Sequence, residues 1–447
     1  MKSFLDISIR QIQKDIEAKK INQLDIAQIC IDRIKQIEPS CQAWEIFDED
    51  KLIEQMKCCR EGPLCGIPIG VKDIFNTADF PTQMGSPIWE DFTPGNDARA
   101  VYNLKNAGAV IPGKTVTAEF AVHALGKTLN PHDSTRNPGT SSSGSAVAVA
   151  TGMVPAAIGT QTAGSIVRPA SYCGIYGCKP SFGLIPRTGV LKTCDTLDTI
   201  GFFVSHACDL QLMFHVLRVH GKNYPIYNNV LKDEVRNINK RGKKWQIAVT
   251  YTNTFDCADL YAKEKFTKWT ENLSESNSID LIYMYMPKKV GNAHEIHSTI
   301  YDKSLSHYFK SEYQKNELVS PTMNEIIERG MKITVEQYLT ALQEQVKIQR
   351  AMDDFFNDHD IIISLSTAGV APLRDEPEKP DPALIWTLAH LPVVSVPAFT
   401  HDGLPFGIQI VARKYNDYLL FDFIDYLRDM ELIPEGVSPR MKEDTNV

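Results

Sequence analysis

The stretch NPGTSSSGSAVAVATGMVPAAIGTQTAGSIV, residues 137–167, contains no Asp, Glu, Lys or Arg. Its Gly- and Ser-rich beginning has the composition of a flexible linker, but linkers seldom continue into a small-residue apolar run such as SAVAVATG. That run is typical of a helix buried on all sides, and PAAIGTQTAGS after it predicts a short strand and a second turn. A compact helix and strand would bring two hydroxyl-bearing turns, residues 141–145 and 160–165, to one place.

The flanking sequence predicts a largely buried sheet with helices on its faces, which is an α/β fold. Helical spacing occurs in the first sixty residues, in DARAVYNLKNAG (97–108) and over most of residues 260–357. Short apolar runs typical of strands are IPIGV (67–71), GAVIPG (108–113), WQIAVTY (245–251), DIIISLS (360–366), PVVSVPAF (392–399) and PFGIQIVA (405–412).

The composition is that of an ordinary globular protein acting on something small. The 447 residues carry a net charge of −8, so there is no basic footprint for nucleic acid. The ten cysteines are scattered without a CxxC pair, which predicts reduced thiols. The N-terminal residues lack the apolar core of a signal peptide, and no apolar run is long enough to span a bilayer, so we expect a cytoplasmic protein.

Two motifs resemble ligand sites without the context that such sites need. GAVIPGKT, residues 108–115, matches the phosphate-loop pattern GxxxxGK[ST], but its interior is itself a strand candidate and no strand precedes Gly108. We therefore expect Lys114 to bind no nucleotide. His294 and His297 in HEIH lack the spacing of a zinc-binding HExxH helix, so we expect no metal site there.

Ser165, in TQTAGSIVRPA, is a candidate nucleophile and needs a base. His132 is the nearest upstream histidine and stays open as a base, although it lies in a polar, loop-like stretch. Lys72, at the end of the strand-like IPIGV run, is the better candidate, because burial would lower its pKa and leave a neutral amine. The alternative for Lys72 is a structural lysine that forms a salt bridge at a strand end.

Together these stretches resemble the amidase signature family. The resemblance is carried by GPLCGIPIGVKDIF, by AGAVIPGKTVTAEFA, by residues 138–191 with TLDTIG after them, and by LPVVSVPAFTHDGLPFGIQIVA. It extends from about residue 5 to 430 and is weakest across 220–350. It implies one large α/β domain, 1–447, with a mixed sheet flanked by helices on both faces. Its expected parts are N-terminal helices (1–60), a catalytic core (61–210), a variable, mostly helical substrate-side segment (220–357), and closing strands and helix (358–430).

The resemblance also implies a Ser-cisSer-Lys triad. Carried over by position, Lys72 is the base, Ser141 the relay serine that follows a cis peptide, and Ser165 the nucleophile. The backbone amides of Thr162, Ala163, Gly164 and Ser165 would form the oxyanion hole. Ser165 would attack an amide carbonyl and form an acyl enzyme, which water then cleaves without a metal or other cofactor.

Two positions depart from the family pattern, and a third has an open role. Ala163 replaces a common glycine, and His390, in WTLAHLPVVSVP, also stands where glycine is more usual. His390 is therefore a candidate to narrow the pocket or contact substrate. Arg168, three residues beyond Ser165, either pins the loop to backbone carbonyls or clamps a substrate carboxylate.

The resulting hypothesis is a free-standing hydrolase that cleaves the C–N bond of a small amide. Its expected partner is a small-molecule amide, with no nucleic acid and no membrane, and a homodimer is compatible with the resemblance. One alternative is the glutamine-hydrolysing subunit of a tRNA-dependent amidotransferase, which needs partner chains. A second alternative is a catalytically silent binding protein on the same scaffold.

Overall fold

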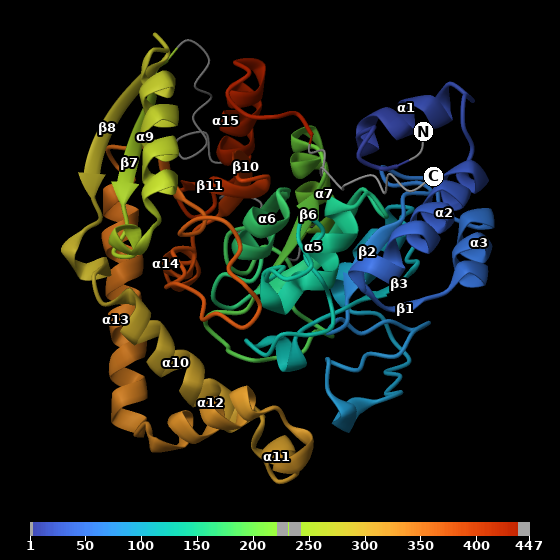
Figure 1. The fold of residues 1–447 in the computed structure, drawn as a ribbon, viewed down its shortest axis with the longest axis horizontal. Coiled ribbons are helices and arrows are strands. Elements are labelled where there is room, and N and C mark those ends of the chain that lie inside the picture. Colours follow the sequence, from blue (N-terminus) through green and yellow to red (C-terminus); the bar gives the residue numbers. More distant parts are fainter. Residues whose placement is uncertain (1–2, 221–230, 232–242, 437–447) are drawn as a thin grey trace.

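An eleven-stranded mixed sheet runs through the computed structural model, which describes residues 3–220, 231 and 243–436 (Figure 1). Helices flank both faces of this sheet, so the predicted α/β fold class is confirmed. The order of the strands is β1-β3-β2-β4-β6-β5-β10-β11-β9-β7-β8. The strands are β1 (Trp44–Phe47), β2 (Ile69–Lys72), β3 (Gly113–Thr115), β4 (Ala156–Gln161), β5 (Tyr176–Lys179), β6 (Thr199–Val204), β7 (Trp245–Tyr251), β8 (Ile279–Tyr285), β9 (Ile361–Leu365), β10 (Val393–His401) and β11 (Leu404–Ala412).

The helices cover the sheet and extend beyond one end of it (Figure 1). They are α1 (Ile9–Glu17), α2 (Gln23–Cys41), α3 (Glu49–Lys57), α4 (Arg99–Asn106), α5 (Ser143–Ala150), α6 (Val167–Cys173), α7 (Leu210–Leu217), α9 (Leu260–Ser274), α10 (Ala293–Tyr308), α11 (Lys310–Tyr313), α12 (Pro321–Lys332), α13 (Val335–Phe355), α14 (Leu384–Leu388) and α15 (Asp417–Asp429). Of the described helices, none is long and apolar enough to cross a membrane. All ten cysteines are described, and all are free thiols.

The charge-free stretch forms the buried centre of the fold. Every residue of α5 and of β4 is buried, as the run of small apolar side chains predicts. A side chain at Gly144 would collide with the backbone of Ala43 and Val116, so glycine allows α5 to lie directly on its neighbours. Strand β2 runs parallel to β3 and β4, and this pairing places the end of β2 beside the turns on either side of α5.

Two strands occur where the sequence predicts only helices. β1 lies among the N-terminal helices, and β8 lies within residues 260–357. β8 has the sequence IDLIYMY, and it forms the sheet edge with several side chains exposed, among them Ile282, Tyr283 and Tyr285. The GAVIPG run also differs from expectation, because only an isolated bridge forms at Val110 and the strand begins at Gly113. Part of the expected 220–357 segment, residues 221–230 and 232–242, lies outside the described residues.

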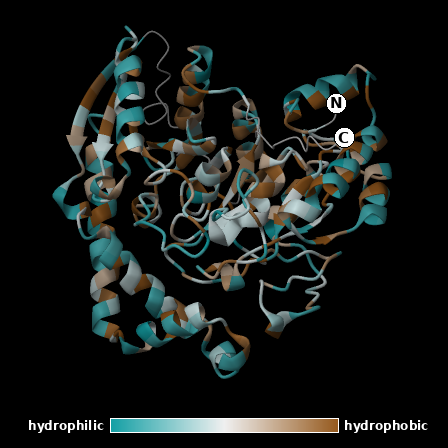
Figure 2. Ribbon diagram, viewed as in Figure 1, coloured by the Kyte–Doolittle hydropathy of each residue, from teal (hydrophilic) through white to brown (hydrophobic). Residues whose placement is uncertain are grey.

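The long helices of the 260–357 region bury only one side. In α13 the buried positions are Ala341, Gln345, Ile348 and Met352, which is the spacing of one helical face. Figure 2 shows hydrophilic residues along much of α9 and α13, whereas hydrophobic residues gather on the central elements. The large core therefore belongs to the sheet, and the outer helices form a cover beside it.

Candidate active site

Lys72 ends strand β2 and is fully buried. Its Nζ donates hydrogen bonds to three hydroxyls: Ser141 Oγ at 2.8 Å, Ser142 Oγ at 3.0 Å and Thr160 Oγ1 at 3.1 Å. Burial lowers the pKa of Lys72 well below its ordinary value, and the distant charge of Asp198 only partly opposes this. Among the described residues no carboxylate forms an ion pair with Lys72, so the salt-bridged alternative does not describe this lysine.

Ser141 connects Lys72 to a strained segment. It lies in the 3₁₀ helix Thr140–Ser142, and its hydroxyl donates to the carbonyl of Ala121 at 2.9 Å. Phe120 and Ala121 both have positive φ, 47° and 59°, which is uncommon for residues with side chains. This strained turn is what directs the Ala121 carbonyl at Ser141.

The expected cis peptide before Ser141 is wrong for this structure, since all peptide bonds between described residues are trans. Two successive residues with positive φ turn the chain instead, Gly139 at 102° and Thr140 at 65°. A side chain at Gly139 would collide with Pro169, so only glycine fits there. The turn therefore presents Ser141 to Lys72 through left-handed backbone at two residues.

The loop that carries Ser165 has its carbonyls bound and its amides free. His297 Nε2 donates to Thr162 O at 2.8 Å, Thr387 Oγ1 to Ala163 O at 2.7 Å, and Arg168 N to Gly164 O at 2.9 Å. The N–H groups of residues 162–165 donate to no acceptor in the described part of the chain. With the carbonyls held outward, these amides are available to an oxygen atom of a ligand.

Gln161 holds the same loop from its other end. Its Oε1 accepts hydrogen bonds from the amides of Ile166 at 2.8 Å and Val167 at 3.0 Å, at the start of α6. Its Nε2 donates to Thr387 Oγ1 at 3.0 Å, and Thr387 in turn binds Ala163. Ser165 itself is 6% exposed, and its hydroxyl makes no hydrogen bond to another described residue.

Arg168 is buried and paired with two carboxylates. Its Nη1 lies 2.9 Å from Glu378 Oε2 and 3.0 Å from Asp381 Oδ2. Burial disfavours the charged guanidinium, but these carboxylates outweigh it and raise the pKa of Arg168. The compensated charge favours the structural interpretation of Arg168, while binding of a substrate carboxylate stays a prediction.

Glu378 joins the two serine-bearing turns. One carboxylate oxygen accepts from Asn137 Nδ2 at 2.6 Å and from Thr140 Oγ1 at 2.9 Å, while the other pairs with Arg168. Thr140 immediately precedes Ser141, and Arg168 lies three residues after Ser165. A single side chain of the 366–383 loop thus fixes both turns.

His390 occupies a left-handed position just after α14, with φ of 65°, which explains why glycine suits this site. Its ring stacks on Phe182 at 4.0 Å, and its Nε2 donates to the carbonyl of Thr196 at 2.7 Å. Burial lowers its pKa to about 3, so the ring is neutral. The stacking and the hydrogen bond hold the ring within the protein, and the role of His390 toward substrate stays a prediction.

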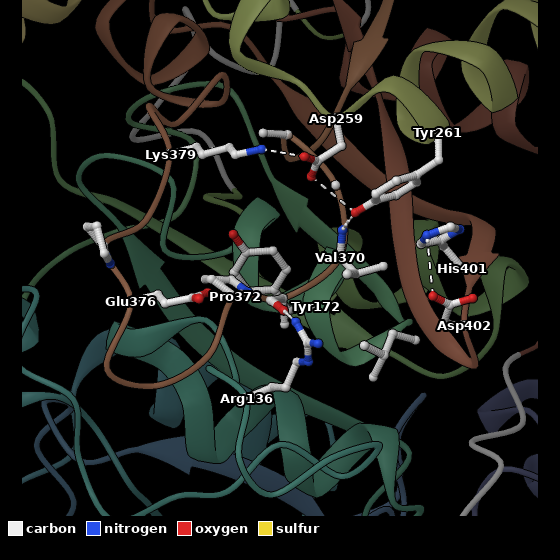
Figure 3. A pocket seen from close by; sticks show the side chains of 15 residues that line it. Arg136, Tyr172, Asp259, Tyr261, Val370, Pro372, Glu376, Lys379, His401 and Asp402 are labelled. Carbon is white, nitrogen blue, oxygen red and sulfur yellow. Dashed lines mark hydrogen bonds and ion pairs between the residues drawn. The ribbon is translucent and has the colours of Figure 1, made fainter.

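A cavity of about 240 Å³ opens beside these groups. Of its lining residues, Ala121 contacts Ser141 and Thr160 contacts Lys72. Lys192 and Asp198 contribute charge, and Asp198 accepts a hydrogen bond from Thr162 Oγ1 at 2.8 Å. The remaining lining residues are Ile74, Arg187, Val190, Leu191, Thr193, Thr199 and Ile200. A larger cavity of about 370 Å³ shares no lining residue with it (Figure 3), and Lys72, Ser141 and Ser165 line neither of the two.

The other candidates from the sequence lie in structural positions. Lys114 is buried in β3, where it pairs with Asp73 at 3.0 Å and donates to the carbonyls of Phe75 and Pro81. It therefore has no phosphate-loop geometry. His132 donates from Nε2 to Cys173 O at 3.0 Å, and His294 to Asp381 O at 3.0 Å.

Several residues at the site were missed in the sequence. Ser142 and Thr160 contact Lys72 and had a local signal, since both belong to the two hydroxyl-bearing turns. Gln161 lies in the second turn, but nothing near it indicates that its amide caps α6. Thr387 and Glu378 come from more than 200 residues away, so no local pattern could reveal them.

Comparisons with known proteins match nearly the whole chain. The sequence model of the Amidase family matches residues 25–421. A glutamyl-tRNA(Gln) amidotransferase subunit of Carboxydothermus hydrogenoformans is 27% identical and covers 92% of this chain and 94% of its own. The subunit of the same name in Coxiella burnetii is 28% identical and covers 97% of this chain and 99% of its own. The solved structure of the peptide amidase of Stenotrophomonas maltophilia has a TM-score of 0.81 at 22% identity, and the match covers 98% of this chain and 99% of that one. This likeness shows the fold.

These relatives correct the expected partners. We expected a small-molecule amide as the sole partner, no nucleic acid, and a homodimer as a compatible assembly. This expectation is contradicted, because the relatives are named as subunits of an amidotransferase for glutamyl-tRNA(Gln). The physical reason for the error is that net charge reports only on this chain's own surface. It carries no information on other chains that assemble with it.

Proposed function

The chain belongs to the amidase signature family, and from this premise we propose that it is the glutamine-hydrolysing subunit of a tRNA-dependent amidotransferase. The proposal is supported by the relatives named as glutamyl-tRNA(Gln) amidotransferase subunits, which this chain matches over more than nine tenths of both lengths. The observation that carries the chemistry is the buried Lys72 amine, which contacts three hydroxyls and no carboxylate among the described residues. A desolvated lysine of this kind is a base near neutral pH.

In the proposed reaction, Ser165 Oγ attacks the side-chain amide carbon of L-glutamine. Ser165 gives its proton to Ser141, and Ser141 gives its own to the neutral Lys72, 2.8 Å away. For this step the Ser141 hydroxyl rotates from Ala121 O toward the lysine lone pair. The base thus acts through a relay, and Lys72 ends the step as an ammonium.

The developing oxyanion would bind the free amides of residues 162–165. One such donor, placed in a site shielded from water, lowers the barrier by about 3 kcal/mol. Lys72 then returns the proton through Ser141 to the departing nitrogen, and ammonia leaves. Water attacks the γ-glutamyl ester by the same proton path and releases glutamate.

The adjoining cavity suits a small polar amide. Its volume is about 240 Å³, and its lining carries charges of both signs, Arg187 and Lys192 as cations and Asp198 as an anion. An α-amino acid carries one charge of each sign, so glutamine is complementary to this lining. In the assembled enzyme, the released ammonia would pass to an acyl group carried by tRNA.

The test is release of glutamate and ammonia from L-glutamine by the purified chain, alone and with its co-purifying partner chains. We expect turnover that is lost in Ser165→Ala. Ser143→Ala is the matched control, because its buried hydroxyl makes no hydrogen bond to any described residue and its loss should leave the rate unchanged. Hydrolysis of other primary amides but not glutamine, or no turnover of any amide, would refute the proposal.

A further inference from the structure

The larger cavity shares no lining residue with the cavity beside Lys72 and Ser141. It has a volume of about 370 Å³ and is enclosed by three segments: the 368–379 loop, the start of α9, and the turn between β10 and β11 (Figure 3). Tyr172 of α6 and Arg136 complete the lining. The cavity therefore lies where elements from three distant parts of the chain meet.

Tyr172 brings an unsatisfied hydroxyl to this cavity. Its side chain is more than nine-tenths buried, yet its hydroxyl forms no hydrogen bond within the described residues. Burial and the negative charge of Glu378 raise the pKa of Tyr172 well above its ordinary value, so the phenol keeps its proton. In Figure 3 the ring of Tyr172 lies in the middle of the pocket. A protonated phenol in the cavity lining, with no hydrogen bond to another described residue, is a donor that a ligand in the cavity can use.

Arg136 supplies a second unsatisfied donor on the same side. Its Nη1 donates to Ala371 O at 2.8 Å, while its buried Nε has no hydrogen-bond partner among the described residues. The carboxylate of Asp133 lies 3.6 Å from Nε, which is an ion-pair contact but too long for a hydrogen bond. No hydrogen bond joins Arg136 Nη2 or the Tyr172 hydroxyl to another described residue, so these two groups can donate to the two oxygens of a carboxylate.

The acidic residues of the lining do not oppose an anion strongly. Asp259 is neutralised by Lys379 at 2.6 Å and accepts from Tyr261 OH at 3.1 Å. The side chain of Asp402 is 86% exposed, so water screens it, and Glu376 is exposed as well. Arg136 and the Tyr172 hydroxyl are therefore donors of the lining that none of its carboxylates binds among the described residues.

The walls favour a flat or apolar body. Tyr261 stacks on His401 with ring centres 3.7 Å apart and planes 6° from parallel, and Val370 and Leu404 add apolar surface. Such a surface binds an aromatic ring or a short hydrocarbon by contact and by exclusion of water.

We propose that this cavity is a second binding site, specific for a small carboxylic acid with a flat apolar body. The carboxylate binds Arg136 and Tyr172, and the body lies against Tyr261 and Val370. The chain links the cavity to the serine-bearing turns, because its lining residue Lys379 directly follows Glu378, which pairs with Arg168. The inference does not rest on the proposed glutamine hydrolysis, since binding can be measured without turnover.

The test is titration calorimetry of the full-length protein with benzoate, and with benzamide as its uncharged counterpart. We expect benzoate to bind at millimolar concentration or better and benzamide to bind at least tenfold more weakly. Arg136→Gln should weaken benzoate binding about tenfold or more, and Tyr172→Phe about fivefold, the effects of losing a charged and a neutral hydrogen bond.

Controls separate this site from nonspecific binding and from damage to the fold. Arg99→Gln and Tyr285→Phe make the same chemical changes at exposed positions outside the cavity and should leave benzoate binding unchanged. Circular dichroism establishes whether each variant is folded. If the Tyr172→Phe protein does not fold, the Arg136→Gln protein still tests the proposal. Absence of benzoate binding, equal binding of benzamide, or binding unaffected in folded Arg136→Gln protein would overturn the proposal.

Discussion

At the scale of single residues, the proposed chemistry depends on a lysine surrounded by hydroxyls. Replacing it by Lys72→Met keeps the volume of the side chain and removes the base, so we expect kcat to fall by about 10³-fold or more. Ser142→Ala removes only one of the three hydroxyls around Nζ and should cost less than tenfold. Steady-state kinetics of both folded variants measure the difference, and a Lys72→Met protein with normal kcat would contradict the assignment.

The lowered pKa of Lys72 gives a pH dependence with a definite sign. Desolvation favours the neutral amine, and only the neutral amine accepts a proton, so kcat/KM should rise with pH and level off above the pKa. Because the shift is downward, the midpoint of the rise should lie clearly below the ordinary lysine value of about 10.4. A pH–rate profile of the purified enzyme checks this, and a rate that falls with pH across the neutral range would exclude a lysine base.

Lys114 illustrates a buried charge used for stability. Lys114→Met would leave the buried carboxylate of Asp73 without its partner, which costs about 3–5 kcal/mol of the free energy of unfolding. Lys35→Met, at an exposed pair with Glu49, should cost at most about 1 kcal/mol. Urea denaturation of the two variants compares these costs, and equal small losses would show that the Lys114 pair does not contribute as described. Neither variant should gain or lose nucleotide binding, since we expect none.

At the scale of elements, the 366–383 loop aligns the two serine-bearing turns through Glu378. Glu378→Gln keeps the shape of the side chain but removes the ion pair with Arg168 and weakens the hold on Thr140. We expect kcat to fall about tenfold or more with a smaller change in KM, because the loss affects alignment more than binding. Asp375→Asn in the same loop is the exposed control. A change confined to the melting temperature would reduce Glu378 to a structural role.

The local sequence predicted some elements well and others not at all. The SAVAVA run and the strands near the C-terminus follow from burial, since continuous apolar runs have no other stable environment. β1 has only four residues, and β8 is an edge strand within a region of helical spacing, so neither had a distinct pattern. The turn at Ser141 depends on Gly139 and Thr140 together, and local sequence does not choose between that turn and a cis peptide.

The candidate site likewise contains residues that the sequence predicts and residues that it does not. Lys72 and Ser165 are predicted from distinctive stretches and Ser141 from the family resemblance, and the structure brings Lys72 and Ser141 into contact. The partners that hold the turns, Glu378, Thr387 and His297, come from distant segments. Their roles follow from tertiary packing, which only coordinates provide.

At the scale of the whole molecule, the proposed function requires other chains. A tagged chain expressed in its native host should co-purify with at least one further polypeptide in constant proportion, and glutamine hydrolysis should be faster in that assembly than in the isolated chain. Co-purification followed by mass spectrometry and a glutaminase assay measures both. Isolation of the chain alone, with full glutamine turnover, would contradict its role within a larger assembly.

The most direct measurement for the central claim is the mass of the intact protein after rapid acid quenching during turnover of L-glutamine. We predict a covalent adduct equal in mass to one γ-glutamyl group, located on the peptide that contains Ser165. The adduct should be absent in Ser165→Ala and nearly absent in Lys72→Met, because the nucleophile is missing in the first and its base in the second. Turnover of glutamine without any adduct on Ser165, or an undiminished adduct in Lys72→Met, would contradict the account.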